Sequence, residues 1–221
     1  MRVLLIEDEP TTAKSIELML SSEGFNVYTT DLGEEGLDLG KLYDYDIILL
    51  DLNLPDMHGY DVLKKLRVAK VGTPVLILSG INEMDSKVRA LGFGADDYVT
   101  KPFHIEEVLA RVRALIRRAA GHASSELTCG PLRLDTKASK ADVDGVPLKL
   151  TSHEFRLLAY LMHHMGEVVS RTELVEHLYD QDFDRDSNTI EVFVGRLRKK
   201  MGIDMIETVR GMGYRMREPE A

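Results

Sequence analysis

The chain has 221 residues, of which 44% are hydrophobic and 29% charged, and its formal net charge is −9 at pH 7. This composition is that of a globular protein with one large domain or two small ones, and the acidic balance argues against non-specific coating of nucleic acid. Cys129, the single cysteine, excludes a disulfide framework and a thiolate metal cluster, and it fits the reducing cytoplasm. We expect neither a signal peptide nor a membrane partner, because the N-terminus turns acidic early and no apolar run is long enough to cross a bilayer.

Strands and helices alternate through the first half of the chain. Short apolar runs predict strands at residues 2–6, 25–29, 47–51, 75–78 and 95–100. Amphipathic stretches predict helices at residues 10–20, 37–42, 60–68, 86–91 and 105–118. This alternation predicts an α/β domain with a doubly wound five-stranded parallel sheet and right-handed crossovers.

Polar side chains that could take part in a reaction lie at the ends of four of these strands. Glu7 and Asp8 follow the first, Asp51 ends the third, Ser79 follows the fourth and Lys101 follows the fifth. The carboxyl ends of parallel strands meet at one rim of a sheet, where α/β proteins place their chemistry. Taken singly, an acidic strand end is a common loop cap and a lysine is a solvated side chain, but together and in this order they indicate one functional site.

A divalent cation would hold this rim together. Three carboxylates crowded at one place repel one another unless a cation joins them, and Mg²⁺ prefers oxygen ligands. The expected ligands are Asp8, Asp51, the backbone carbonyl at Asn53 and, through a water, Glu7. The remaining oxygen of Asp51 would attack a phosphoryl group as a nucleophile. Lys101 would neutralise charge on the transferred oxygens, and Ser79 would donate a hydrogen bond to one of them.

The same residues carry a family resemblance. Residues 1–121 resemble the receiver domain of two-component response regulators, which has the flavodoxin-like fold. The matching motifs are the acidic pair after the first strand, the run LLDLNLPDMHG around Asp51, the Ser–Gly pair after the fourth strand and the run ADDYVTKPF. The resemblance implies phosphorylation of Asp51 by a histidine kinase or a histidine phosphotransferase, with Mg²⁺ required. It also implies a switch in which Ser79 is drawn to the phosphoryl group and Tyr98 turns inward, beside a cis Lys101–Pro102 bond. By itself, Tyr98 would be interpreted as a half-buried aromatic residue of the strand.

The predicted fourth helix, fifth strand and fifth helix form a face of mixed charge. Its charged residues are Lys87, Asp96, Asp97, Glu107, Arg111 and Arg118. In one subfamily of the receivers such a face forms ion pairs between the two copies of a symmetric homodimer. The pairings would be Lys87 with Glu107, Asp97 with Arg111, and Asp96 with Arg118. The alternative is a solvated charged face with an i,i+4 pair between Glu107 and Arg111 inside one helix.

A different pattern follows the small, polar residues 119–125, which predict a flexible linker. Residues 127–150 contain short alternating segments and a hairpin signal at Asp144 and Gly145. Thr151 and Glu154 form a capping-box pattern that begins a helix, and a second helix begins after Ser170. A third helix runs from residue 187 or 188 to residue 201, and residues 205–216 predict a hairpin. Three helices followed by a hairpin indicate a winged helix-turn-helix.

Basic residues gather on the third helix and the hairpin of this acidic protein. From residue 196 to residue 217, seven lysines and arginines face only two acidic residues. The exposed face of the helix, with Arg196, Lys199 and Lys200, would enter the major groove of double-stranded DNA, and Arg210 would reach the neighbouring minor groove. The alternative is that cations late in a helix stabilise its dipole.

This half carries a second resemblance, to the OmpR/PhoB-type effector domain, over residues 126–218. The matches are LTSHEF at residue 150, VFVGRLRKK at residue 192 and ETVRGMGYR at residue 207. The resemblance implies an antiparallel sheet of four strands before the helices. It also implies DNA contacts at Asn188, Thr189, Arg196, Arg198, Thr208 and Arg210. Gly195 stands where relatives often carry a basic residue and Asn188 replaces a frequent arginine, which leaves the sequence preference open.

We therefore expect a receiver domain at residues 1–118, a linker at 119–125 and a winged-helix domain at 126–218. Phosphorylation would promote dimerisation and promoter binding, with RNA polymerase as a further candidate partner. The receiver half resembles cell-cycle master regulators of alphaproteobacteria and the effector half another branch of the family, which suggests separate histories or a chimera joined near Ser124. Two alternative functions are a constitutive DNA-binding regulator with a vestigial receiver, and a phosphatase with an aspartyl nucleophile. The phosphatase would need a second aspartate at the position of Asn53.

Overall fold

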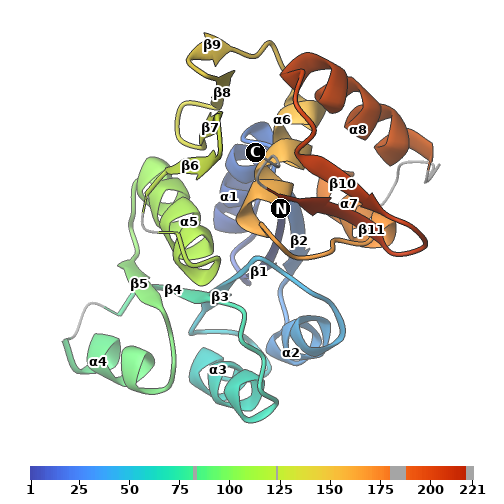
Figure 1. Cartoon of the computed structure of the whole chain (residues 1–221). Helices are drawn as coiled ribbons and strands as arrows, with labels where there is room; N and C mark the ends of the chain where they lie inside the picture. The colour runs from blue at the N-terminus through green and yellow to red at the C-terminus, as the bar shows by residue number, and fades with distance from the viewer. Residues whose placement is uncertain (82–83, 123, 180–187, 218–221) are drawn as a thin grey trace. The chain divides into compact units, whose positions relative to one another are not determined.

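The structure is a computed structural model that describes residues 1–81, 84–122, 124–179 and 188–217. The chain divides into two compact units, Met1–Ala119 and Ala120–Ala221, which are described separately (Figure 1). Across the described residues, no helix combines the length and the apolar character that crossing a bilayer would require.

The first unit is a parallel sheet of five strands in the order β2-β1-β3-β4-β5, which confirms the predicted doubly wound sheet. The strands are β1 (Arg2–Ile6), β2 (Asn26–Thr30), β3 (Ile47–Asp51), β4 (Val75–Ser79) and β5 (Asp97–Thr100). The helices are α1 (Pro10–Ser22), α2 (Gly33–Leu42), α3 (Gly59–Val68), α4 (Met84–Gly92) and α5 (Ile105–Ala119). The helices α1 and α5 cover one face of the sheet, and α2, α3 and α4 cover the other (Figure 1).

Burial on both faces explains the continuous apolar runs of the central strands. Every residue of β1, β3 and β4 is buried, and alternate side chains of each strand enter opposite cores. In β3, Ile48 and Leu50 join the core under α2 and α3, while Ile47 and Leu49 join the core under α1 and α5. A strand covered on both sides has no solvent face on which to place polar residues.

Helix α2 begins four residues earlier than its apolar pattern predicts, at Gly33 rather than at Leu37. The carboxylate of Asp56, in the loop after β3, accepts hydrogen bonds of 2.8 Å from the backbone N–H groups of Gly33 and Glu34. These contacts satisfy two donors that a helix N-terminus otherwise leaves unpaired. The cap comes from a distant part of the chain, so the local pattern does not reveal it.

The second unit begins with an antiparallel sheet of four strands in the order β6-β7-β8-β9, as the resemblance implied. Its elements are β6 (Glu126–Cys129), β7 (Leu132–Asp135), β8 (Lys140–Val143), β9 (Val146–Pro147), α6 (Ser152–His163), α7 (Arg171–Leu178), α8 (Asn188–Met201), β10 (Ile206–Val209) and β11 (Gly213–Met216). The capping box at Thr151 and Glu154 begins α6, and a second one at Ser170 and Glu173 begins α7.

The hairpin of β10 and β11 is attached to the segment before α7. Val169 and Tyr214 exchange backbone hydrogen bonds of 2.8 and 2.9 Å. Gly213 is required at this junction, because a Cβ atom there would lie 2.0 Å from the carbonyl oxygen of Val169. The predicted apolar stripe of α8 is buried, at Ile190, Val194, Leu197 and Met201.

Candidate functional site

Asp51 lies at the carboxyl end of β3, the central strand of the receiver sheet, and is only 4% exposed. Its Oδ1 accepts a hydrogen bond of 3.2 Å from the backbone N–H of Asn53, which orients the carboxylate. Gly59 allows the loop to return over the strand end, because a Cβ atom there would lie 2.2 Å from the backbone oxygen of Asp51. The loop thus holds the carboxylate in a fixed position at the rim.

The structure brings the predicted acidic residues together. Glu7, Asp8 and Asp51 each offer a carboxylate oxygen, and these atoms lie within 4.8 Å of one another. The side chain of Glu7 is buried, its Oε2 has no hydrogen-bond partner, and burial is the main cause that raises its pKa to about 7. A buried oxygen without a partner beside two further carboxylates fits a hard divalent cation, since such a cation would satisfy all of them.

Lys101 reaches into this cluster from the loop after β5. Its Nζ lies 2.6 Å from Oε1 of Glu7 and 2.6 Å from Oδ2 of Asp51. Burial alone would lower the pKa of Lys101, but the hydrogen bonds to Asp51 and Glu7 outweigh it and raise the pKa. The Lys101–Pro102 bond is cis, as the resemblance implied, and the backbone N–H of Lys101 donates to the carbonyl of Ser79.

Ser79 and Tyr98 meet at the same residue, Ile81. Ser79 is fully buried, and its Oγ accepts a hydrogen bond of 3.1 Å from the backbone N–H of Ile81. The hydroxyl of Tyr98 donates to the carbonyl of Ile81 at 2.7 Å, and the residue is only 8% exposed. In this structure the tyrosine therefore lies inward, and the loop after β4 joins it to the serine beside the carboxylates.

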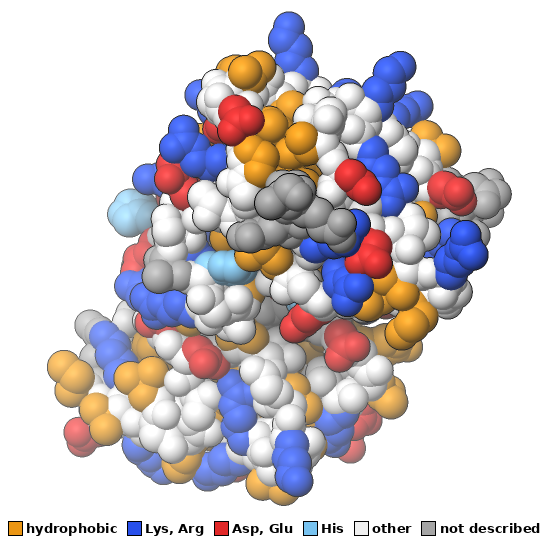
Figure 2. All heavy atoms as spheres, viewed as in Figure 1, with side chains coloured by type: hydrophobic (Ala, Val, Ile, Leu, Met, Phe, Trp, Pro, Cys, Tyr) orange, Lys and Arg blue, Asp and Glu red, His pale blue; other side chains and the backbone are white. Residues whose placement is uncertain are grey.

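The basic residues of α8 fall into two groups. Arg196, Lys199 and Lys200 are exposed and Arg198 is half-buried, but only Arg198 and Lys200 hydrogen-bond to other parts of the same unit through their side chains, among the contacts described. On the hairpin, Thr208 is exposed and Arg210 lies next to the turn, also exposed. In Figure 2, Lys and Arg side chains project from the part of the surface that α8 forms. The side chain of Asn188 lies outside the described residues, and Thr189 is half-buried.

Comparison with known families agrees with both halves. Residues 3–113 match the family described as response regulator receiver domain, and residues 145–216 match transcriptional regulatory protein, C terminal. The cell cycle response regulator CtrA of Brucella anthropi is 54% identical over 226 residues, which cover 100% of this chain and 97% of the relative, and CtrA of Brucella ovis is as similar.

The chain is an OmpR/PhoB-type response regulator. It is a phosphorylation-controlled transcription regulator with a receiver domain and a DNA-binding domain. The match to CtrA extends through both halves of the response regulator, so it gives no support to a chimera joined near Ser124. Neither matched family is an enzyme family.

Solved structures agree with this classification. The Francisella response regulator 1452 receiver domain has a TM-score of 0.52 and 36% identity, and the match covers 53% of this chain and 97% of that chain. A chain described as "a novel family of redox sensors in the streptococci evolved from two-component response regulators" has a TM-score of 0.51 and 30% identity. That match covers 98% of this response regulator and 99% of the streptococcal chain.

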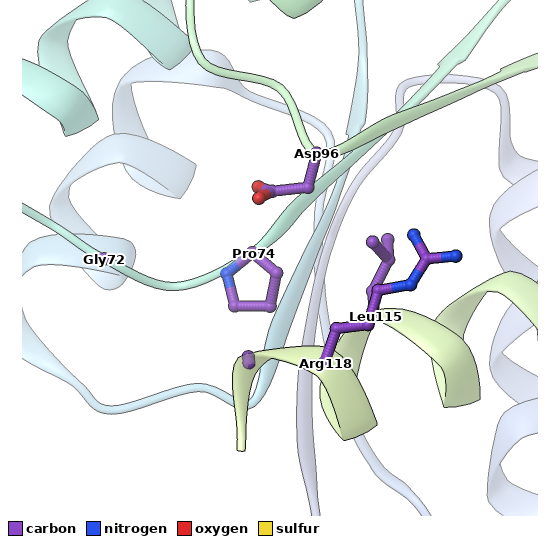
Figure 3. Close-up of a pocket in the computed structure, with 6 residues that line it drawn as sticks. Gly72, Pro74, Asp96, Leu115 and Arg118 are labelled. Atoms are coloured by element: carbon purple, nitrogen blue, oxygen red, sulfur yellow. The ribbon is translucent and has the colours of Figure 1, made fainter. Parts of the chain in front are cut away.

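The charged face of the response regulator's α4, β5 and α5 contains ion pairs within the chain. Arg111 binds Asp97 at 2.7 Å and Glu107 at 2.8 Å, so the i,i+4 pair is present. In Figure 3, the carboxylate of Asp96 and the guanidinium of Arg118 point away from each other across a surface hollow. Sequence reasoning did not predict that apolar side chains of α4 would be exposed on this face, as they are at Met84, Val88 and Leu91.

Sequence reasoning also missed Arg67, which is the partner of Asp96 in this structure. The guanidinium of Arg67 lies 3.0 Å from Oδ2 of Asp96 and donates to the carbonyls of Val71, Thr73 and Gly94. The same carboxylate oxygen accepts from the backbone N–H of Val75. Nothing in the local pattern of α3 distinguishes Arg67 from its exposed lysine neighbours, so tertiary contact alone identifies it.

Proposed function

We propose that Asp51 accepts a phosphoryl group from a histidine kinase or a histidine phosphotransferase. The observation that carries the proposal is the cluster of Glu7, Asp8 and Asp51, with its partnerless buried oxygen, at the end of the central strand. Asp8, Asp51 and the backbone carbonyl of Asn53 would hold Mg²⁺, and Glu7 would act through a water. The cation would supply positive charge to the phosphoryl oxygens.

The transfer exchanges one phosphorus bond for another. An oxygen of Asp51 bonds to phosphorus as the phosphorus–nitrogen bond of the phosphohistidine breaks, and the released ring nitrogen retains the electron pair. Lys101 Nζ lies 2.6 Å from Asp51 Oδ2, and its positive charge would stabilise the negative charge on the oxygens of the transferred phosphoryl group. Ser79 Oγ would donate a hydrogen bond to another phosphoryl oxygen.

The switch passes through the loop after β4. Because Ser79 and Tyr98 both hydrogen-bond to Ile81, drawing the serine toward a phosphoryl group changes the position that the tyrosine prefers. The ammonium of Lys87, on α4, lies 5.9 Å from the centroid of the Tyr98 ring. The state of Asp51 would thus reach the surface of α4.

We propose that this surface forms a symmetric homodimer through α4, β5 and α5. Exposed apolar side chains on α4, among them Val88 and Leu91, give the face a hydrophobic centre. The predicted pairings between copies are Lys87 with Glu107, Asp97 with Arg111, and Asp96 with Arg118. Asp97 now pairs with Arg111 of the same chain and Asp96 with Arg67. In the dimer each aspartate would pair with a cation of the second copy instead.

Dimerisation would control DNA binding by raising the local concentration of the second winged helix on a repeated site. In each copy, α8 would enter the major groove with Asn188, Thr189, Arg196 and Lys199, while Thr208 and Arg210 of the hairpin would contact the backbone and the minor groove. Such a regulator would work in the cytoplasm, and its DNA-bound dimer would contact RNA polymerase.

Acetyl phosphate with Mg²⁺ tests the phosphorylation site directly. Intact mass should rise by one phosphoryl group in the wild type and in Asp44→Ala, a control near the opposite end of β3, but not in Asp51→Ala. Full modification of Asp51→Ala would reject the assignment.

Two alternative functions predict different results. A constitutive regulator with a vestigial receiver would bind DNA equally well with and without phosphorylation. A phosphatase would turn over phosphomonoesters, for which Asn53 offers no acidic group.

A further inference from the structure

We infer that Arg198 and Lys200 position the recognition helix and do not contact DNA, although both belong to its basic run. The inference rests on the proposed role of α8 in the major groove. It assigns these two cations to the hairpin and to the N-terminus of α6, and it leaves Arg196 and Lys199 as the cations of α8 that face DNA.

Arg198 ties α8 to the hairpin. Its Nε donates to the carbonyl of Ile206 at 2.9 Å, and its Nη2 donates to the same carbonyl and, at 2.8 Å, to Oγ1 of Thr208. The pairing of Arg217 N–H with the carbonyl of Met205 implies that the carbonyl of Ile206 points away from β11, because such bonds alternate along an antiparallel pair. The guanidinium therefore satisfies a carbonyl on the open edge of β10.

Lys200 ties the last turn of α8 to the beginning of α6. Its Nζ lies 2.6 Å from Oε2 of Glu154 and 2.8 Å from the carbonyl oxygen of Lys149. The side chain of Glu154 is only 1% exposed, and Oε2 also accepts from the backbone N–H of Thr151. A charged carboxylate buried this deeply is stabilised by a nearby cation, so Lys200, whose side chain remains 36% exposed, is paired with Glu154 in the free protein.

The two attachments lie on opposite flanks of the helix. Residues 198 and 200 are separated by roughly 160° around the axis on the side that carries the buried apolar stripe. The opposite face is exposed and carries Val192, Gly195, Arg196 and Lys199. Two attachments on opposite flanks fix the rotation of α8 about its axis, and this rotation decides which side chains reach the base edges.

The salt dependence of binding separates the two roles. A cation that neutralises a DNA phosphate releases a counterion, so its removal lowers the slope of log affinity against log salt by about 1. A positioning residue lowers affinity without contributing to that slope. The probe is a duplex that the wild-type full chain enriches from a random pool, with affinity measured over a series of KCl concentrations.

We expect Arg196→Gln and Lys199→Gln to lower the slope by about 1 each, and Arg198→Gln and Lys200→Gln to leave the slope unchanged while affinity falls. A slope that falls by about 1 in Arg198→Gln or Lys200→Gln would overturn the inference and leave the DNA-binding role intact. A wild-type chain that enriches no duplex would overturn both.

A double-mutant cycle keeps the inference testable if a variant folds poorly. Glu154→Gln removes the charged partner of Lys200 without changing any residue of α8, so it should lower affinity as Lys200→Gln does, and the double variant should show no further loss. Losses that multiply in the double variant would mean that Lys200 acts independently of Glu154, which contradicts a positioning role. For Arg198, the Nε–H resonance should remain protected from exchange in both free and DNA-bound protein, and loss of protection on binding would argue for a DNA contact.

Discussion

Lys101 Nζ lies 2.6 Å from Oδ2 of Asp51, although 50 residues separate the two in the chain. The same ammonium group is 2.6 Å from Oε1 of Glu7, so one lysine holds two carboxylates that would otherwise repel each other. In the proposed mechanism this cation has two uses: it balances the acidic rim before transfer and the phosphoryl oxygens afterwards. Its removal should affect these two functions in opposite directions.

Lys101→Ala should bind Mg²⁺ more tightly, by roughly tenfold, because the acidic rim loses a competing positive charge. Phosphorylation of Asp51 by acetyl phosphate should nevertheless slow by about 10²-fold, because the transferred oxygens lose their cation. Calorimetric titration with Mg²⁺ and intact-mass kinetics measure the two effects. Lys65→Ala, which removes an exposed lysine from α3, is the control and should change neither. Unchanged Mg²⁺ affinity in Lys101→Ala would contradict a shared site.

The apolar side chains of α4 supply a matched test of the dimer face. Val88 is 60% exposed on α4, and Val68 is 84% exposed at the end of α3. With beryllofluoride and Mg²⁺ present, Val88→Asp should weaken dimerisation by tenfold or more, because a charge would be buried at the centre of the interface. Val68→Asp should not weaken it. Sedimentation velocity measures both, and a monomeric Val68→Asp beside a dimeric Val88→Asp would place the interface elsewhere.

The pH dependence of stability should report the contact between Glu154 and Lys200. Burial would raise the pKa of Glu154, but hydrogen bonds from Lys200 and Thr151 lower it below the usual value of 4.5. A lowered folded-state pKa stabilises the protein above pH 4.5, and the stabilisation is lost as pH falls through the folded-state value. Glu154→Gln should therefore reduce the free energy of unfolding by about 1–3 kcal/mol at pH 7, and the deficit should shrink below pH 4.5. Denaturant unfolding across pH measures the deficit.

The exposed Glu126→Gln is the control for this series and should show little deficit at any pH. A deficit in Glu154→Gln that stays constant down to pH 3 would show that the charge of Glu154 does not contribute to stability.

Two glycines should respond to the same substitution with opposite signs. A Cβ atom at the exposed Gly195 of α8 would meet nothing within 4 Å, so Gly195→Ala should stabilise the protein by about 0.5–1 kcal/mol through helix propensity. At Gly59 a Cβ atom would lie 2.2 Å from the backbone oxygen of Asp51, so Gly59→Ala should destabilise the receiver. Thermal unfolding of both variants checks the contrast, and a loss of stability in Gly195→Ala would contradict the open space around position 195.

Local pattern was sufficient for most of the fold and for the residues of the acidic rim. Runs such as that of Ile47–Asp51 require burial on both faces, and parallel strands necessarily bring their carboxyl ends to one rim, so the topology followed from the alternation of elements. The capping box at Thr151 and Glu154 was equally readable, since its two hydrogen bonds join residues three positions apart. The capping box joins neighbours in the sequence, whereas the rim joins distant residues whose meeting place follows from the common direction of the parallel strands.

Tertiary structure decided which of several chemically similar groups has a partner. Asp56 caps the N-terminus of α2 by accepting a hydrogen bond from Glu34, 22 residues away, and Arg67 pairs with Asp96, 29 residues away. Arg198 and Lys200 look like neighbours of Arg196 in a basic run, yet both are bound within their own domain, Lys200 to a carboxylate 46 positions away. A basic side chain can bind DNA, a carboxylate or a carbonyl group, and its position in the sequence does not decide among them. Its role depends on which of them the fold places within hydrogen-bond distance, and only three-dimensional packing determines that.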